Sequence, residues 1–188
     1  PQEEELEDSF SKNAGSVSVS RNASTAFKIH YTPERDDFRH LTTFILDSNA
    51  ALAAAKSCGV SLTVYLTSAM LLALQRIQDE QTPDKRRQKP IRVVVPVNLR
   101  RLFPSRTLRN FVHVIMPEID PRMGDYEFSE ILTSVKHQLG LLVTKKNLCA
   151  MFTPNVNAER SPLLRVMPLF LKNIAMKLVY DTVGERTN

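Results

Sequence analysis

Apolar runs of strand length alternate along the chain with longer amphipathic stretches, and four of these runs predict β-strands. Residues 27–32 (FKIHYT) and 40–47 (HLTTFILD) are rich in β-branched and aromatic side chains, which favours strands. Residues 91–97 (IRVVVPV) and 111–117 (FVHVIMP) are continuous apolar runs, and such runs are typical of strands covered on both faces. Pro96 has no N–H to donate, so we expect it near the end of its strand or on a sheet edge.

Two helices are predicted between the second and third strands. Asp47 or Ser48 supplies a side-chain cap for the first helix, and Gly59 ends it. Ser61 caps the second helix, which continues through residue 78 with apolar residues around much of its circumference. That distribution predicts a central, well-buried helix.

The last third of the chain predicts two further helices. A long helix is expected over residues 126–147 with Asp125 as its cap, followed by a loop over residues 149–160. Pro162 suits the first turn of the last helix, and Pro168 is expected to kink or restart it. The order β-β-α-α-β-β-α-α predicts a mixed α/β or α+β class. Of the two we expect the α/β class, with a mixed sheet and flanking helices.

The composition changes near residue 25 and divides the chain. Residues 1–25 are acidic and then rich in Ser and Asn, which predicts a linker or arm. Residues 26–188 carry the hydrophobic pattern. A chain of 188 residues that is 43% hydrophobic and 24% charged is long enough to bury one sizeable core.

Charge and cysteine content narrow the class of protein. The formal charge of +5 permits anionic partners without requiring them. Cys58 and Cys149 lie far apart and outside any CxxC motif, which favours reduced thiols and a cytoplasmic protein. The acidic start PQEEELED differs from a secretory signal. Residues 162–180 are apolar but are interrupted by Arg165 and Lys172, among others, so we expect no transmembrane span.

The sequence lacks the motifs of self-contained hydrolases and metalloenzymes. Its four histidines show no metal-ligand spacing, and it contains neither GxSxG nor a P-loop, so no metal site is expected. His113 lies in the predicted strand 111–117, on the same face as Phe111 and Ile115. It is either a core or edge histidine that bonds a neighbour or a polar group projecting into a substrate channel.

A basic segment connects the third and fourth predicted strands. Nine basic residues and no acidic residue occur from Lys85 to Arg109, and arginine binds phosphate oxygens in bidentate fashion. Few aromatic residues are interleaved for base stacking, and no nucleic-acid-binding signature is present. The segment therefore favours a small anionic ligand or a structural role over nucleic acid. Asn98 and Arg100 directly follow the strand, where amide and guanidinium groups can hold the carbonyls of a tight loop.

Several stretches, in order along the chain, resemble one known family. They are GVSLTVYLTSAMLLALQRIQ, VVVPVNLRRLFPSRTLRNF, IDPRMGDYEFSEI, TKKN, NAERSPLLRVMPLFLKN and VGERT. Together they resemble bacterial alcohol acetyltransferase-like proteins, which are relatives of condensation domains in the chloramphenicol acetyltransferase-like superfamily of CoA-dependent acyltransferases. The resemblance covers about residues 40–188.

The resemblance implies a two-lobed fold with a substrate tunnel between the lobes, and it implies that residues 26–188 are part of the second lobe. The superfamily's catalytic motif is HHxxxDG, whose second histidine acts as general base on the acceptor. That motif is absent from this sequence, and the nearest stretch, residues 30–34 (HYTPE), lacks the histidine pair. The resemblance therefore implies a catalytic histidine upstream, and the catalytic residues stay unknown.

Two motifs carry over from the family. PVNLR implies that Asn98 and Arg100 lie near the tunnel, and RNFVHV aligns with the condensation-domain pattern GxFVN, with His113 at the Asn position. The neighbouring arginines are candidates for ligand phosphates. The candidate residues on the substrate-channel or CoA side are Asn98, Arg100, Arg101, Arg106, Arg109, Asn110 and His113.

These observations predict a segment of an acyltransferase that transfers an acetyl or acyl group from a CoA thioester to an alcohol or amine and is inactive alone. Its partners would be a small-molecule acyl donor and acceptor, with acetyl-CoA or another acyl-CoA as co-substrate and no permanently bound cofactor. The alternative is a non-catalytic interaction or dimerisation module. In that case a homo-oligomer would form through exposed sheet edges or the apolar residues 162–182.

Overall fold

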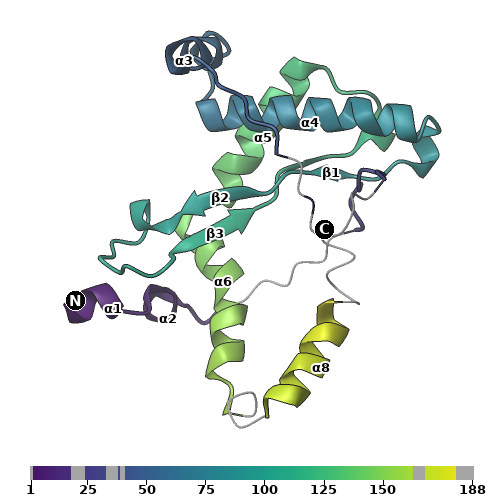
Figure 1. The fold of residues 1–188 in the computed structure, drawn as a ribbon. Helices are drawn as coiled ribbons and strands as arrows, with labels where there is room; N and C mark the ends of the chain where they lie inside the picture. The colour runs from purple at the N-terminus through teal and green to yellow at the C-terminus, as the bar shows by residue number, and fades with distance from the viewer. Residues whose placement is uncertain (1, 18–23, 33–37, 39–40, 163–167, 181–188) are drawn as a thin grey trace. The chain divides into compact units, whose positions relative to one another are not determined.

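The computed structural model describes residues 2–17, 24–32, 38, 41–162 and 168–180. The chain divides into two compact units (Figure 1). Unit 1 consists of Pro1–Thr25, Val94–Pro117 and Gln138–Asn188, and unit 2 consists of Ala26–Val93 and Glu118–His137. Helices and two small antiparallel sheets make up the described residues, which agrees with the mixed class predicted from the sequence.

Unit 1 is built on an antiparallel pair of strands, β2 (Val95–Asn98) and β3 (Val112–Ile115), which lie side by side in Figure 1. Val95 pairs with Ile115, and Asn98 pairs with Val112. The short helix η2 (Leu99–Arg101) follows β2 directly. The unit also contains the helices α1 (Glu3–Leu6), α2 (Ser9–Asn13), α6 (Lys145–Arg160) and α8 (Leu169–Val179).

Four phenylalanines form the centre of unit 1. Phe10 packs edge-to-face on Phe111 and Phe152, with ring centroids 4.9 and 5.4 Å apart. Phe103 packs in the same manner on Phe111 and Phe152, at 6.3 and 5.8 Å. Edge-to-face contacts of this kind add to the stabilisation that comes from burying the rings. The cluster joins residues from the amino-terminal, central and carboxyl-terminal parts of the chain.

The amino-terminal segment is part of this packing, where the sequence predicts a linker or arm. Ser9 is only 2% exposed. The N–H of Gly15 donates to Oγ1 of Thr153 at 3.0 Å, and the Arg160 guanidinium donates to the carbonyl of Ser11 at 2.7 Å. For the described residues 2–17, the polar composition therefore does not decide the structure, because Phe10, Ser11 and Gly15 have partners on α6.

Unit 2 contains α3 (Ser48–Ser57) and α4 (Leu62–Gln81), with the caps that the sequence predicts. Asp47 accepts the N–H of Ala50 at 2.7 Å, and Ser61 accepts the N–H of Val64 at 3.3 Å. Gly59 has φ of 67°, the left-handed conformation in which a glycine ends a helix without strain.

The described part of unit 2 also contains a two-stranded antiparallel sheet, two short helices and most of one long helix. The strands are β1 (Ile91–Arg92) and β4 (Glu118–Ile119), in which Ile91 pairs with Ile119. The short helices are η1 (Lys85–Arg87) and η3 (Pro121–Met123). The long helix is α5 (Phe128–Leu142), whose residues through His137 belong to this unit.

Two glutamines explain how α4 buries polar side chains. The Gln78 amide exchanges hydrogen bonds with the backbone N–H and carbonyl of Lys89, at 3.1 and 3.0 Å. The Gln75 amide does the same with Tyr126, at 3.2 Å in both directions. A buried amide that satisfies its donors and acceptors costs little, so α4 buries one partly polar face. The prediction of a well-buried helix holds for that face only, since Leu66 and Met70 are 46% and 54% exposed.

The first two predicted strands are not found among the described residues. Residues 27–32 and 41–47 are not assigned to any strand, and His40 lies outside the described residues. Strand propensity measures how well a side chain fits a paired, half-buried surface. Phe44 and Ile45 are 81% and 95% exposed, so among the described residues this segment has no strand partner of the kind its composition favours.

The third predicted strand, residues 91–97, is divided into β1 and β2, which pair with different partners. It is not covered on both faces, since Val94 is 55% exposed. Pro117 lies between β3 and β4 and has no N–H for a ladder, which explains why the partner segment is also divided. Pro96 lies in a two-stranded sheet and therefore on an edge, as predicted.

The helical boundaries in the last third differ from the prediction. Helix α5 ends at Leu142 and α6 covers the whole of residues 149–160, which the sequence predicts as a loop. Asp125 does not cap α5 but pairs with Lys85. The segment after Pro162 lies outside the described residues, so the predicted kink or restart is not tested; helix α8 begins after Pro168, which is its N-cap.

Candidate functional site

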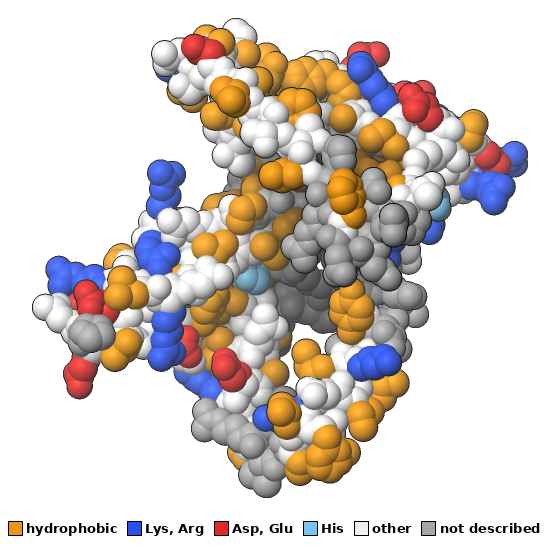
Figure 2. Space-filling view, in the orientation of Figure 1, with side chains coloured by type: hydrophobic (Ala, Val, Ile, Leu, Met, Phe, Trp, Pro, Cys, Tyr) orange, Lys and Arg blue, Asp and Glu red, His pale blue; other side chains and the backbone are white. Residues whose placement is uncertain are grey.

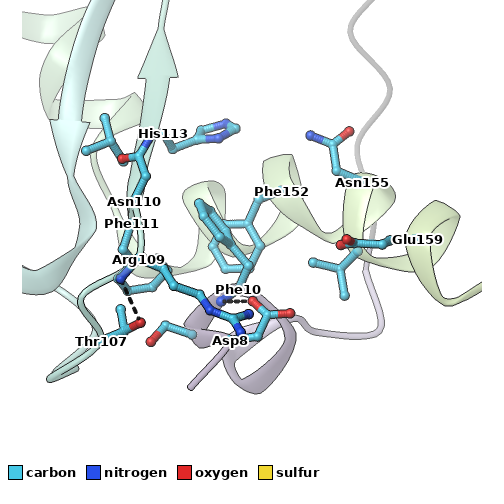
Figure 3. A pocket seen from close by; sticks show the side chains of 13 residues that line it. Asp8, Phe10, Thr107, Arg109, Asn110, Phe111, His113, Phe152, Asn155 and Glu159 are labelled. Carbon is cyan, nitrogen blue, oxygen red and sulfur yellow. Dashed lines mark hydrogen bonds between the residues drawn. The ribbon is translucent and has the colours of Figure 1, made fainter. Parts of the chain in front are cut away.

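Three segments of unit 1 enclose a cavity of about 380 Å³ (Figure 3). They are the amino-terminal end of α2, the loop and strand from residue 107 to residue 113, and one face of α6. The lining residues are Asp8, Ser9, Phe10, Thr107, Arg109, Asn110, Phe111, Val112, His113, Phe152, Asn155, Val156 and Glu159. A volume in this range accommodates a small organic molecule.

Helix α6 presents one stripe of side chains to the cavity. Phe152, Asn155, Val156 and Glu159 are spaced i, i+3, i+4 and i+7, which places them on one face of a helix. Phe152 and Val156 are 1% and 3% exposed, whereas Asn155 and Glu159 are exposed. The stripe therefore supplies an apolar base and two polar groups on the open side.

The loop between β2 and β3 is held by Asn98 and Arg100, as the sequence predicts. The Asn98 side chain accepts the N–H of Arg100 at 3.1 Å and so caps η2. The Arg100 guanidinium donates to the carbonyls of Thr107 and Arg109, at 2.8 and 2.7 Å. Arg100 therefore fixes backbone that lines the cavity, and Asn98 fixes the backbone of Arg100 itself.

Thr107 joins that loop to the amino-terminal segment. Its hydroxyl donates to the carbonyl of Glu7 at 2.7 Å and accepts the N–H of Arg109 at 3.2 Å (Figure 3). Thr107 is 3% exposed. The buried hydroxyl thereby fixes the backbone of Arg109 at the edge of the cavity.

Asp8 is the carboxylate whose environment is best defined. It caps α2 by accepting the N–H groups of Phe10 and Ser11, at 3.2 and 3.3 Å. The hydrogen bond from the Ser11 side chain is the main cause that lowers the pKa of Asp8, and the two N–H groups and the positive charge of Arg109 add to it, against the opposing effect of burial. Asp8 is therefore ionised at neutral pH, beside a guanidinium (Figure 3).

His113 lies on β3 between two fully buried residues of the same strand face, Phe111 and Ile115, both 0% exposed. Its ring meets the ring of Phe152 edge-on, with centroids 6.3 Å apart. The imidazole is half-buried and lines the cavity. His113 thus packs on a buried aromatic ring and also lines the cavity.

The structure brings together three of the predicted site residues and separates the others. Arg109, Asn110 and His113 line the cavity. Arg106 instead pairs with Glu4 at 3.3 Å, both side chains being largely exposed. Arg101 is exposed and has no ion pair among the residues that the structure describes.

Sequence reasoning missed the half of the cavity that comes from α2 and α6. Asp8 and Phe10 fall in the predicted arm, and Phe152, Asn155 and Glu159 fall in the predicted loop. The i, i+3, i+4, i+7 spacing from Phe152 was a usable signal for a helical face. Pro154 argued against a helix over these residues, because a proline inside a helix removes a backbone hydrogen bond.

Within the described residues, no group of three or more His, Cys, Asp or Glu side chains has the geometry to hold a metal ion. No single helix in the same part of the chain is long and apolar enough to cross a membrane, and α3 with α4 would qualify only as a pair bent by 85°. Comparisons with protein-family models, with curated proteins and with solved structures find no match to this chain.

Proposed function

We propose that this chain is part of a CoA-dependent acyltransferase and that the cavity of unit 1 binds the acyl acceptor. The observation that supports the proposal is that Arg109, Asn110 and His113, three candidates for the substrate channel, line one cavity of small-molecule size. The mixture of helices and antiparallel strands is compatible with one lobe of the chloramphenicol acetyltransferase-like fold.

In this proposal the chain binds substrates but does not turn them over alone. The HHxxxDG motif, which supplies the general base in the superfamily, is absent from the sequence. We expect no release of thiol from acetyl-CoA in a thiol-trapping assay of the isolated chain with alcohols or amines. Sustained release that depends on the chain would contradict this assignment of roles.

The CoA phosphates are assigned to Arg101. Arg106 is engaged by Glu4, and Arg109 lies beside Asp8 in the cavity. Arg101, at the end of η2, is exposed and has no ion pair within the described part of the chain. An exposed guanidinium at a loop tip is suited to bidentate contact with a phosphate.

Titration calorimetry with CoA and acetyl-CoA at low salt tests this proposal. We expect saturable binding that Arg101→Gln weakens about threefold to tenfold, the range for one exposed charge-assisted contact. Arg76→Gln is the matched control, because Arg76 is an exposed arginine on α4 in unit 2. Failure of both ligands to bind, or equal effects of the two substitutions, would overturn the proposal.

A second candidate function, a non-catalytic interaction module, is favoured by one specific observation. Figure 2 shows hydrophobic side chains on the surface over α8, and Phe170, Ile174 and Leu178 are 57% to 65% exposed. Exposed apolar surfaces of this kind mark protein or membrane contacts. Light scattering coupled to size-exclusion chromatography tests it, since a docking role predicts self-association that Ile174→Lys abolishes and Lys172→Gln leaves in place.

A further inference from the structure

A second hollow of unit 1, with a volume of about 590 Å³, lies between the segment that follows α2 and the first turns of α6. We call it the amino-terminal pocket, and its lining residues are Gly15, Ser16, Val17, Thr144, Lys146, Asn147, Cys149 and Ala150. None of them lines the cavity that the proposed function uses. We infer that the amino-terminal pocket binds a short aliphatic carboxylate. This site and its ligand go beyond the proposed function.

Hydrogen bonds hold the two walls of the amino-terminal pocket together. The N–H of Gly15 donates to Oγ1 of Thr153 at 3.0 Å, and the Cys149 thiol donates to the carbonyl of Asn13 at 3.1 Å. Thr153 is 0% exposed, so the acceptor of the first bond is shielded from water. A Cβ at Gly15 would lie 3.1 Å from Sγ of Cys149, and the glycine therefore permits this close approach. Because these contacts fix the walls, the pocket exists before a ligand binds, which lowers the entropic cost of binding.

The lining surface of the amino-terminal pocket is mostly apolar. Val17 is 65% exposed there, and Ala150 is 8% exposed. Covering apolar surface stabilises a complex by about 25 cal/mol for each Å² removed from water. An aliphatic chain in the pocket covers the side chain of Val17, so the lining favours a ligand with such a chain over a wholly polar ligand.

The charge of the lining favours an anionic head group. Lys146 is the one basic residue of the lining, and no acidic residue belongs to it. Lys146 is exposed and forms no ion pair with any residue that the structure describes. Its ammonium group carries one charge and three donors, which match the single charge and the acceptor oxygens of a carboxylate. An alkylammonium ion would meet a like charge, and an alcohol would gain from its chain alone.

Three six-carbon probes test this selection: hexanoate, 1-hexanol and hexylamine share one chain and differ in the charge of the head group. Their dissociation constants are measured with the full chain at pH 7.5 and low salt, by titration calorimetry and ligand-observed NMR. We expect hexanoate to bind about threefold to fivefold more tightly than hexanol, the range for one exposed charge contact. Hexylamine is expected to bind weakest.

Two adjacent lysines provide a matched pair of variants. Lys146→Gln removes the charge that lines the pocket and is expected to reduce the affinity for hexanoate to that for hexanol. Lys145→Gln removes an exposed charge one residue away that does not line the pocket, and it should leave the preference for hexanoate in place. Val17→Ser, at a largely exposed position, is expected to weaken binding of all three probes about threefold, because it removes apolar surface.

The two cysteines of the chain locate the bound ligand. Cys149 is half-buried and lines the amino-terminal pocket, whereas Cys58 is exposed in unit 2 and serves as the internal reference. Hexanoate at about nine times its dissociation constant leaves about one tenth of the sites open. Alkylation of Cys149 by iodoacetamide, followed by peptide mass spectrometry, should therefore slow about tenfold, and the rate at Cys58 should stay the same.

The inference is overturned if hexanol binds as tightly as hexanoate, if hexylamine binds tightest or if none of the probes binds. It is also overturned if Lys146→Gln behaves as Lys145→Gln, or if hexanoate leaves the alkylation of Cys149 unchanged. None of these measurements uses CoA, acetyl-CoA or the residues that line the cavity of the proposed function. The inference and the proposed function can therefore fail independently of each other.

Discussion

Arg100 should stabilise the wall of the cavity more than any other arginine of the basic segment. Its guanidinium donates to two carbonyls, those of Thr107 and Arg109, at 2.8 and 2.7 Å. The perturbation that tests this role is Arg100→Met, which keeps an unbranched side chain and removes both bonds. Arg100→Lys is the graded variant, because one ammonium cannot reproduce the planar fork that reaches two carbonyls.

The expected magnitude follows from the two bonds and their exposure. A hydrogen bond from a charged donor contributes about 1.5–3 kcal/mol when it is well shielded. The bond to Thr107 is partly buried and the bond to Arg109 is exposed, so we assign about 1.5 kcal/mol to the first and about 0.5 kcal/mol to the second. Arg100→Met should therefore lower the free energy of local unfolding of this loop by about 2 kcal/mol, and Arg100→Lys should lower it by about 1 kcal/mol.

Hydrogen exchange of peptides that cover residues 99–111 measures the loss of local stability in the loop that Arg100 holds. The amide of Leu99 donates to the carbonyl of Phe111 at 3.1 Å, and the amide of Leu108 donates to the carbonyl of Glu5 at 2.8 Å. Both are expected to exchange about 30-fold faster in Arg100→Met and about fivefold faster in Arg100→Lys, since 1.4 kcal/mol corresponds to a factor of ten. Arg101→Met is the control. The reasoning is refuted if Arg100→Met exchanges within twofold of Arg101→Met.

Three further changes test other parts of the structure. Ser68→Ala should stabilise unit 2 by about 1 kcal/mol in denaturant unfolding, because its fully buried hydroxyl has no partner among the described residues and alanine favours a helix; a loss of stability would contradict this. Gly59→Ala should lower the free energy of unfolding by about 1 kcal/mol, since the φ of Gly59 is 67°. Gly140→Ala within α5 should raise the free energy of unfolding by about 0.5 kcal/mol, because a Cβ there meets nothing within 4 Å. Equal melting temperatures of the two variants would refute this contrast. The pKa of Asp8 is lowered by folding, so its contribution is present above its unfolded value near 3.8 and is lost as the pH falls through the lower folded value. Asp8→Asn should flatten that acid-side loss in a pH series of melting temperatures, and an unchanged profile would count against it.

Features of the fold that depend on neighbouring residues in the sequence were predictable. The caps at Asp47 and Ser61 and the stop at Gly59 are local, and each is found where the sequence predicts it. The loop role of Asn98 and Arg100 is local too, since their partners lie within nine residues. Side-chain bonds over such short separations require no tertiary structure to be recognised.

Features that depend on distant partners were not predictable. Residues 41–46 have a strand composition, but a strand also requires an adjacent strand, and none pairs with them among the described residues. Helix α6 contains Pro154, yet the burial of Leu148, Phe152 and Val156 on one face outweighs the local penalty. In both cases tertiary contacts decide the structure against the local signal.

The basic segment shows why the same limit applies to the candidate site. Four arginines occur within ten residues of one another, and the sequence alone treats them nearly alike. Their roles differ because Arg106 meets Glu4 and Arg109 lies near Asp8, partners about a hundred residues away, while Arg100 turns back onto its own loop. Arg101 keeps an exposed guanidinium. Arg109 therefore lies inside the cavity beside a carboxylate, whereas Arg101 is exposed at the end of η2. That difference is why we propose Arg101, rather than Arg109, as the residue that binds phosphate.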